Sequence, residues 1–397
     1  MMLVVLANAN AQSKVEKYIE SGVVPLDQKK GFRFNTEAGE FVLKPYVLIQ
    51  ASAEYNRYDD EGLNLADQDN VANSGFAIPN AILGFSGSAF NKLTYTIALN
   101  ASKTGGALLQ QAWLDVNIKD EFRVRVGKFK TPYQHAYLTT IGQTLFSTLP
   151  ASLTTPVRTN LSLDAVQPTI NTGFDLGVQL HGTVNEKFGY QVGIFNGTGI
   201  GTNNAIKGTS DDTKGLPSLL YAGRVAYTPM GTMPSHQGDP SDLNNNKMSI
   251  ALSGSANIEG NNESSNDYRT GVEFAWIHKK LYVAAEFYSM TMNWTKRMRR
   301  NEKFNSWGAY VQAGYFVAPK VQVAARYDVM DRNGKDLDGI LNMPAVGANY
   351  FFSSINLKLQ AMYQYLGKSG HSTQVERDGD DLGMAYQHAK IQLQYTF

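Results

Sequence analysis

The end of the chain, residues 384–397, alternates between apolar and polar side chains and stops on an aromatic residue. A repeat of two residues is the repeat of a β-strand, whose successive side chains point to opposite faces. The apolar face comprises Ala385, Ala389, Ile391, Leu393, Tyr395 and Phe397. A soluble sheet can alternate in the same way, but an apolar face that ends on a terminal Phe is typical of the closing strand of an outer-membrane β-barrel.

The composition agrees with a barrel and excludes several other classes of protein. The 397 residues are 43% hydrophobic, yet they contain no uninterrupted apolar run of the length, about 18 residues, that suggests a membrane helix. Without such helices, only a closed barrel satisfies every backbone group inside a bilayer. The chain has no cysteine, which excludes disulfides, thiolate metal sites and Cys nucleophiles. Its net charge of +1 gives no indication of a nucleic-acid partner.

The N-terminus has features of a secretion signal. A short apolar run, Leu3 to Leu6, precedes small residues that end at Ala11, after which a signal peptidase could cut. A disordered N-terminus is the alternative. We therefore expect a signal-peptide remnant at 1–11, a periplasmic segment at 12–40 and the barrel at 41–397.

Sixteen segments alternate with a period of two, most of them near the 9–11 residues that a tilted strand needs to cross a membrane. They are 41–56, 78–88, 93–101, 110–118, 122–129, 174–184, 188–195, 221–228, 248–258, 268–277, 281–290, 307–317, 321–329, 346–352, 357–366 and 384–397. Short connections alternate with long ones, as in bacterial barrels with short periplasmic turns and long external loops. One connection on the short-turn side, Pro229–Lys247, is an exception because it is long.

The two faces of the expected strands differ in charge. In 321–329, for example, Gln322, Arg326 and Asp328 share the face opposite the Val and Tyr residues. A charge facing lipid at mid-membrane costs about 2–4 kcal/mol, so the charged face should line a water-filled lumen. Its expected cations are Lys44, Arg123, Arg125, Arg224, Arg269, Arg326, Lys358 and Lys390. Its expected carboxylates are Glu54, Asp115, Asp175, Glu273, Glu286 and Asp328.

These patterns predict an all-β fold, a 16-stranded antiparallel transmembrane β-barrel that is wide enough for an aqueous channel. A soluble β-sandwich or propeller would also alternate. Such a protein would bury its apolar faces and leave the charged faces outside, whereas here the repeated hairpins share one face rich in both signs of charge.

The third long loop, 130–173, is far longer than an ordinary hairpin connection and is rich in Tyr, Leu and Phe. Such side chains would be costly to leave in water, so we expect the loop to fold into the lumen and narrow it. The alternative is an apolar loop that packs on a neighbouring subunit. The expected constriction residues are Tyr133, His135, Tyr137 and Phe146, and Lys128, Lys130 and Arg158 add positive charge to the loop and its base.

Six blocks of sequence resemble the phosphate-selective porin O and P family, in the form found in Bacteroidetes-type bacteria. They are 32–37, 125–133, 174–182, 189–197, 223–229 and 324–328. The resemblance implies a homotrimeric porin of the bacterial outer membrane whose third loop narrows the lumen, and it implies phosphate as a solute. The chain departs from the family at Phe174, where members often carry Arg before Asp175.

The balance of lumen charges favours a weakly selective channel. A pore that binds phosphate needs a dense set of Arg and Lys to replace the hydration of the anion. Here the expected carboxylates offset most of the expected cations. We therefore predict passive diffusion of small hydrophilic solutes with a mild preference for anions, phosphate among them. The alternative is a non-conducting barrel that anchors a partner through Pro229–Lys247 or through the segment 12–41.

Several weaker patterns favour ordinary loops over special sites. The loop Asp331–Gly339 has Lys335 at a calcium-ligand position, and Asp378–Asp381 could hold a divalent cation near lipopolysaccharide. The basic run Lys296–Arg300 could contact anionic lipid headgroups. No Ser shares a catalytic motif with His181 or His388, so we expect no enzyme, cofactor or metal site. The expected partners are outer-membrane lipid, lipopolysaccharide, further copies of the chain and small anions.

Overall fold

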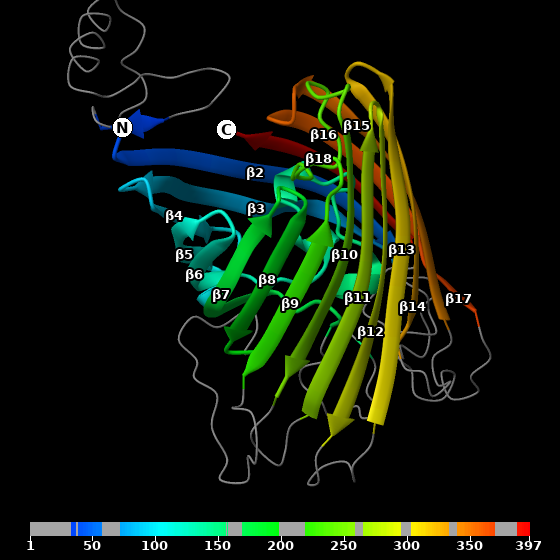
Figure 1. Cartoon of the computed structure of the whole chain (residues 1–397). Helices are drawn as coiled ribbons and strands as arrows, with labels where there is room; N and C mark the ends of the chain where they lie inside the picture. Colours follow the sequence, from blue (N-terminus) through cyan, green and yellow to red (C-terminus); the bar gives the residue numbers. More distant parts are fainter. Residues whose placement is uncertain are drawn as a thin grey trace, which may run out of the picture.

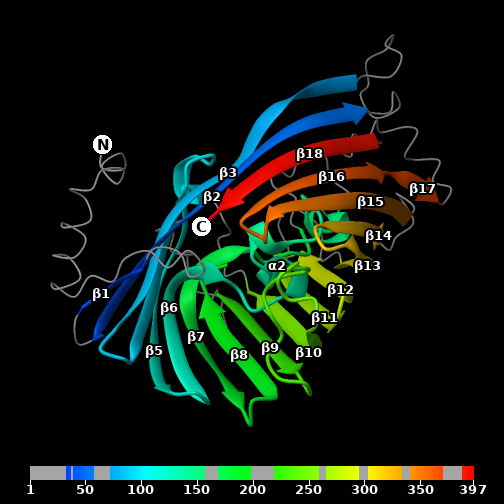
Figure 2. The same ribbon diagram turned by 90° about the horizontal axis from the view of Figure 1, so that it is seen from above.

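A computed structural model describes residues 33–36, 39–57, 72–155, 157, 169–197, 219–258, 265–294, 303–332, 340–369 and 387–397. Antiparallel strands form one continuous sheet that closes on itself because β18 pairs with β2 (Figures 1 and 2). The long strands are β2 (Phe41–Arg57), β3 (Ala72–Ala89), β4 (Leu93–Asn100), β5 (Leu109–Lys119), β6 (Phe122–Lys130), β7 (Phe174–Val184), β8 (Phe188–Phe195), β9 (Leu220–Tyr227), β10 (Asn246–Asn257), β11 (Ser265–His278), β12 (Leu281–Trp294), β13 (Lys303–Ala318), β14 (Val321–Asp331), β15 (Ile340–Ser353), β16 (Leu357–Tyr365) and β18 (Gln387–Thr396). Two short strands, β1 (Phe34–Asn35) and β17 (Gly367–Ser369), pair with β2 and β15.

The sixteen predicted strands are confirmed, and the differences lie at their ends. β3 begins at Ala72 and β15 at Ile340, six residues earlier than predicted in each case. The added part of β15 contains Pro344, which pairs with Tyr327 of β14 and which sequence rules place outside a central strand. In the described part of the chain, no helix has the length and apolarity needed to cross a membrane.

The two faces of the sheet separate as predicted. Along β14 the side chains of Val323 and Tyr327 are exposed on the outer surface, while Gln322, Arg326 and Asp328 are buried inside the ring. The exposed side chains along the middle of the strands are mainly apolar, and most of the charged side chains of the strands point inward. The outer face can therefore contact lipid and the inner face can contact water, as a membrane barrel requires.

Connections of two or three residues join most strands at one end of the barrel, the short-turn end. Phe90 and Asn91 both have positive φ, as do Asn185 and Glu186. This is the type I′ geometry, whose twist matches that of paired strands and which favours Asn. One described connection at this end is different: residues 228–245, between β9 and β10, form a long segment that we call the inner turn.

The segment between β6 and β7, residues 131–173, is called loop 3. Its described part contains α2 (His135–Leu138), η3 (Ile141–Gln143) and α3 (Ala151–Thr154). Figure 2 shows α2 inside the ring of strands. Loop 3 packs on one side of the ring, which we call the docking wall (β11–β16 and β18). The opposite side, the open wall (β5–β9), is built from shorter strands of 8–11 residues.

Candidate functional site

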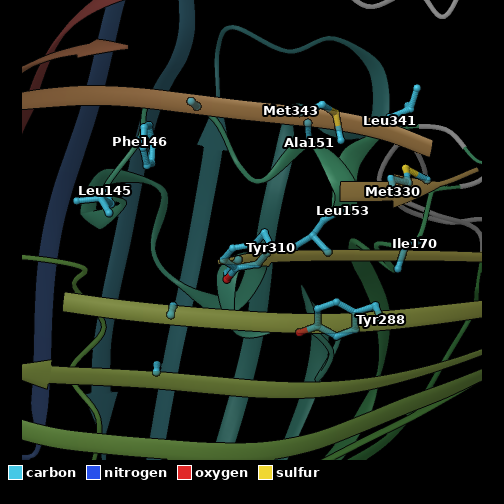
Figure 3. Close-up of a cluster of buried hydrophobic side chains, with 14 of the residues drawn as sticks. Leu145, Phe146, Ala151, Leu153, Ile170, Tyr288, Tyr310, Met330, Leu341 and Met343 are labelled. Atoms are coloured by element: carbon cyan, nitrogen blue, oxygen red, sulfur yellow. The ribbon is translucent and has the colours of Figure 1, made fainter. Parts of the chain in front are cut away.

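Loop 3 is attached to the docking wall by an apolar cluster that lies inside the barrel. Figure 3 shows side chains of the loop and of the strands pointing toward one another between the two elements. The cluster includes Tyr133, Leu145, Phe146, Leu153 and Ile170 from the loop and Tyr288, Tyr310, Met330, Leu341 and Met343 from the wall. Burial of each large side chain contributes about 1.5–3 kcal/mol. The inner surface of this wall is therefore a dry core.

Two glycines of β13 permit the close approach of the loop. A Cβ atom at Gly308 would lie 2.8 Å from the carbonyl oxygen of Ser152, and one at Gly314 would lie 2.4 Å from a methyl group of Leu145. The first contact involves backbone, which cannot move aside easily. Alanine at Gly308 would therefore displace α3 from the wall.

A buried carboxylate fixes the start of α2. Glu286 of β12 accepts hydrogen bonds from the backbone N–H groups of His135, at 3.0 Å, and Ala136, at 2.8 Å. The hydroxyl groups of Tyr288 and Tyr310 also donate to this carboxylate. These four donors satisfy the charge in a dry site, where an unpaired carboxylate would be strongly unfavourable.

An ion pair fixes the next part of the loop. Arg326 lies 2.8 Å from the carboxylate of Asp328, which also accepts a hydrogen bond of 2.7 Å from Ser152. The guanidinium of Arg326 donates to the carbonyl of Thr148 at 3.0 Å and lies 4.6 Å from the centre of the Phe146 ring. Both side chains of the ion pair are fully buried. Arg326 therefore holds the loop and does not line a water-filled space.

Amide side chains continue this attachment around the ring. In one row, Asn100 donates to Asn80, Asn80 to Gln50, Gln50 to Gln394, and Gln394 to the carbonyl of Gly142 in loop 3. In a second row, Gln392 donates to Gln360, Gln360 to Asn349, and Asn349 to Gln322. We call these side chains the amide ladder. They are neutral, and they hydrogen-bond to one another and to the loop backbone.

An open cavity of about 980 Å³ remains beside the open wall. Loop 3 borders it with His135, Leu138 and Thr139, and the inner turn borders it with residues 231–235. Its charged lining residues are Arg123, Arg125, Lys130, Arg224, Lys247, Asp120 and Glu186. The lining therefore carries an excess of positive charge, and it mixes these charges with Gln, Thr and aromatic side chains.

One carboxylate, Asp115 of β5, organises the basic side chains on the open wall. Arg125 donates to one of its oxygens from Nε at 2.9 Å and from Nη2 at 2.7 Å, and His181 Nε2 lies 2.8 Å from the same oxygen. Arg123 Nε lies 3.4 Å from the other oxygen, and Arg125 stacks 4.2 Å from the centre of the Trp113 ring. The arginine side chains remain 30% and 25% exposed, so both reach the cavity.

Other predicted cations at the cavity are also engaged. Arg224 Nε lies 2.7 Å from Glu273, and Lys130 donates to the carbonyls of Tyr137 at 2.5 Å and Thr139 at 2.9 Å. Lys130 thus closes the first bend of loop 3 and borders the cavity at the same time. Arg224 is thus partly neutralised before any solute arrives, whereas Lys130 is held by uncharged backbone carbonyls.

The remaining predicted lumen cations lie away from this cavity. Lys390 pairs with Glu54 at 3.0 Å, and Lys358 is buried and donates to the carbonyl of Thr144 at 3.0 Å. Arg269 is buried, pairs with Asp267 and donates to the carbonyl of Thr169. Lys44 is exposed on the inner face of β2 near the short-turn end.

Lys128 does not line the lumen as predicted. It follows Gly127, whose φ of 123° marks an irregular point in the strand, and it points opposite to Arg125 and Phe129. Its ammonium group is completely buried and donates to the carbonyl of Gly106 at 2.9 Å. Arg158 lies outside the described residues.

The predicted constriction residues divide into two groups. His135 borders the cavity, while Tyr133, Tyr137 and Phe146 are buried. Burial, assisted by the charge of Arg224, lowers the pKa of His135 to about 4, whereas burial raises the pKa of Tyr133 and of Tyr137 above the usual value. The imidazole is therefore neutral at pH 7, and the narrowing presents His135, Leu138 and Thr139 to the solute.

Sequence reasoning missed the amide ladder and the position of the inner turn. The length of Pro229–Lys247 was the available signal, and it was interpreted only in the alternative function, as a docking surface for a partner. The structure instead places Gln237 of this segment inside the barrel, hydrogen-bonded to loop 3.

Within the ranges that the structure describes, no three His, Asp or Glu side chains group as metal ligands would. The loop 331–339, where Lys335 argues against a calcium site, falls largely outside these ranges. The basic run at 296–300 and the acidic run at 378–381 fall outside them entirely, as do residues 1–32, which include the expected signal remnant.

Comparison with known proteins gives a family and a fold. The sequence profile of a family described as "Phosphate-selective porin O and P" matches residues 49–397. An uncharacterised protein of Aquifex aeolicus is 26% identical over 246 residues, which are 58% of this chain and 55% of that protein. The chain thus spans about half the length of this curated relative.

Solved structures with similar folds are barrels of the outer membrane. The anion-selective porin of Comamonas acidovorans has a TM-score of 0.58 at 11% identity, covering 90% of this chain and all of that one. OmpT of Vibrio cholerae, in its trimer form, has a TM-score of 0.54 at 13% identity, covering 90% and 99%. The channel DcaP of Acinetobacter baumannii has a TM-score of 0.53 at 10% identity, covering 92% and 99%.

Proposed function

The chain belongs to the phosphate-selective porin O and P family, and from this premise we propose that its lumen passes small hydrophilic solutes with a mild preference for anions. As a member of the family it is a porin, a channel of the bacterial outer membrane. The short-turn end then faces the periplasm and the long loops face outward. Solutes would pass unchanged, without catalysis and without a cofactor.

The observation that supports the anion preference is the lining of the cavity on the open wall. Arg123, Arg125, Lys130, Arg224 and Lys247 border it against Asp120 and Glu186. Positive charge in a narrow, partly dry passage raises the local concentration of anions. The preference stays mild because Asp115 and Glu273 already neutralise three of these cations. Phosphate would be one of several anions that pass.

Planar-bilayer recordings of the purified protein test this proposal. We expect stable conductance steps and, in a KCl gradient, a reversal potential on the anion side of zero. Replacing chloride by phosphate should lower the current modestly without blocking it. A cation-side reversal potential would contradict the anion preference, and a folded barrel without current would contradict the channel itself.

We further propose that the protein is a homotrimer that associates through the outer faces of β2, β3, β15, β16 and β18. Small side chains there leave shallow apolar grooves beside exposed Phe76, which is 94% exposed in the single chain. The small outward residues are Ala51, Ala53, Ala77, Ala348, Ala361 and Ala389. A second copy of the chain could approach closely over this face, with lipid and lipopolysaccharide around the rest.

Measuring the oligomeric state tests whether this face contacts other subunits or only lipid. We expect unheated protein in mild detergent to migrate as a trimer, and Ala53→Trp on the proposed face to convert it to monomers. The matched substitution Ala325→Trp, on the outer face of β14, should leave the trimer intact. A monomeric wild-type protein would contradict the proposal.

A further inference from the structure

The inner turn, residues 228–245, contacts loop 3 chiefly through one buried residue, Gln237. Gln237 donates its backbone N–H to the carbonyl of Gln143 at 2.9 Å, and its side-chain oxygen accepts the N–H of Leu145 at 2.8 Å. From the opposite side, Gln312 donates to that same side-chain oxygen and Gln322 donates to the Gln237 carbonyl. Gln237 therefore joins loop 3 to β13 and β14 from below.

The rest of the inner turn is built to hold Gln237 in place. Gly231 and Gly238 have φ values of 83° and 146°, a region that other residues rarely adopt. Asp239 accepts a hydrogen bond of 2.8 Å from Ser354, and Lys247 donates to the carbonyl of Met230 at 2.7 Å. The beginning and the middle of the segment are thus fastened to the barrel, which a loop that docks an external partner would not require.

The same segment forms part of the cavity surface. Residues 231–235 border the cavity, and Met233 also packs on the apolar cluster beneath loop 3. Ser235 donates to the side chain of Gln143 at 2.5 Å, at the junction of the two segments. Across the cavity lie Arg224 and the other basic residues of the open wall. A solute that passes loop 3 must therefore also pass the inner turn.

We propose that the inner turn is a second constriction element, which locks loop 3 through Gln237 and confines solutes to a passage along the open wall. This inference rests on the proposed channel function and specifies which segments set its width. Loop 3 narrows the lumen, and the inner turn closes the part of the periplasmic mouth beneath it. The pore is therefore one-sided, with its open area next to Arg123, Arg125 and Arg224.

Removal of the segment gives the first test. Replacing residues 228–245 by a two-residue Asn-Gly turn would make this hairpin like its neighbours. We expect single-channel conductance to rise roughly twofold, because conductance follows the narrowest cross-section. Wild-type conductance from the folded deletion variant would overturn the proposal.

A point substitution tests the hydrogen bonds of Gln237 without depending on the folding of the deletion variant. Gln237→Leu keeps the size of the side chain and removes its hydrogen bonds to Leu145 and Gln312. We expect frequent current transitions as loop 3 becomes free to move. The matched control is Asn244→Leu, the same kind of change at an exposed position of the same turn, which should behave as wild type. If both variants give steady currents without extra transitions, Gln237 does not hold loop 3 in place.

A reversible crosslink tests the lock in a single protein. The chain has no cysteine, and a backbone hydrogen bond places Gln143 beside Gln237. In the double variant Gln143→Cys, Gln237→Cys, the oxidised protein should be quiet and the reduced protein noisy, with each single-cysteine variant insensitive to oxidation. If the oxidised and reduced channels are indistinguishable, the inner turn does not hold loop 3. A wild-type protein without any current would instead refute the channel function, and this inference with it.

Discussion

The docking wall and the open wall carry the same kinds of inward side chain, yet those of the docking wall hold loop 3 and those of the open wall line the cavity. Each contains a paired arginine and aspartate: Arg326 with Asp328 on the docking wall, and Arg125 with Asp115 on the open wall. The first pair is completely buried beneath loop 3, whereas Arg125 keeps 25% of its side chain exposed to the cavity. A charge inside a barrel is therefore a pore residue only where no loop covers it.

The polar contacts of the two walls also differ in their exposure to water. On the docking wall, carboxylates, amides and arginines satisfy the backbone of loop 3, and water is largely replaced. On the open wall, Arg123 and Arg125 keep part of their hydration, although Asp115 between them is buried. Breaking a buried ion pair leaves an uncompensated charge, while breaking a hydrated pair costs little because water substitutes for the lost partner.

The largest expected effect comes from breaking the buried pair. Arg326→Met should lower the free energy of unfolding by about 3–5 kcal/mol, because Asp328 would stay buried without its counter-charge. Arg125→Met on the open wall should cost less, because Asp115, although buried, keeps Arg123 and His181 as partners. Urea unfolding in detergent, followed by tryptophan fluorescence, measures both.

A double substitution is the control for that contrast. Arg326→Met combined with Asp328→Leu removes both charges and should recover most of the lost stability. Two results would contradict a dry docking wall. One is an equal loss of unfolding free energy in Arg326→Met and Arg125→Met, and the other is a double variant that is no more stable than Arg326→Met alone.

Acid should weaken the docking of loop 3, which is the next largest effect. The pKa of His135 is about 4 in the folded protein and about 6.5 when unfolded, so the unfolded chain binds more protons between these values. Stability should be full above pH 6.5 and fall by about 1–3 kcal/mol as the pH approaches 4. The urea midpoint at pH 7.5 and pH 4.5 measures this change. His135→Gln should show a smaller loss, and an unchanged pH dependence in that variant would contradict the assignment.

The barrel itself could be predicted from the sequence because its signal is local. Alternation in segments such as 321–329 records which side chains meet lipid, and the requirement acts on every strand independently. The first residues of β3 and β15 were not predicted as strand, because Asn, Gly and Pro interrupt the apolar–polar alternation there. The inward position of Arg123, Arg326 and Lys390 followed from the same alternation.

The division of the lumen could not be predicted, because it depends on contacts between residues far apart in the chain. Nothing near Arg326 in the sequence indicates that Thr148 and Phe146 cover it, while Arg125 stays uncovered. Lys128 was misplaced because its position at the base of loop 3 was given more weight than strand alternation, which puts it on the face opposite Arg123 and Arg125; its contact with Gly106 is a tertiary feature. Gln237 had only the unusual length of its turn as a signal.

A smaller effect is expected from the amide ladder. Gln50 accepts a hydrogen bond from Asn80 and donates one to Gln394, so Gln50→Leu leaves both partners incomplete. We expect a loss of about 1–2 kcal/mol in unfolding free energy with ion selectivity unchanged. Gln111→Leu on the open wall, where the amide borders the cavity, should cost less. A change in reversal potential for Gln50→Leu would show that the ladder contacts the ion path.

The smallest change in free energy should come from the open wall, and it should appear in selectivity. Asp115→Asn removes the charge that Arg123, Arg125 and His181 share, while an amide can still hydrogen-bond to them. The freed positive charge should raise the anion-to-cation permeability ratio about threefold, equivalent to about 0.7 kcal/mol, as read from reversal potentials. Asp328→Asn on the docking wall removes an equal charge and should lower stability while leaving the ratio unchanged. If Asp328→Asn shifts the ratio as much as Asp115→Asn does, ions reach both walls and the passage is not one-sided.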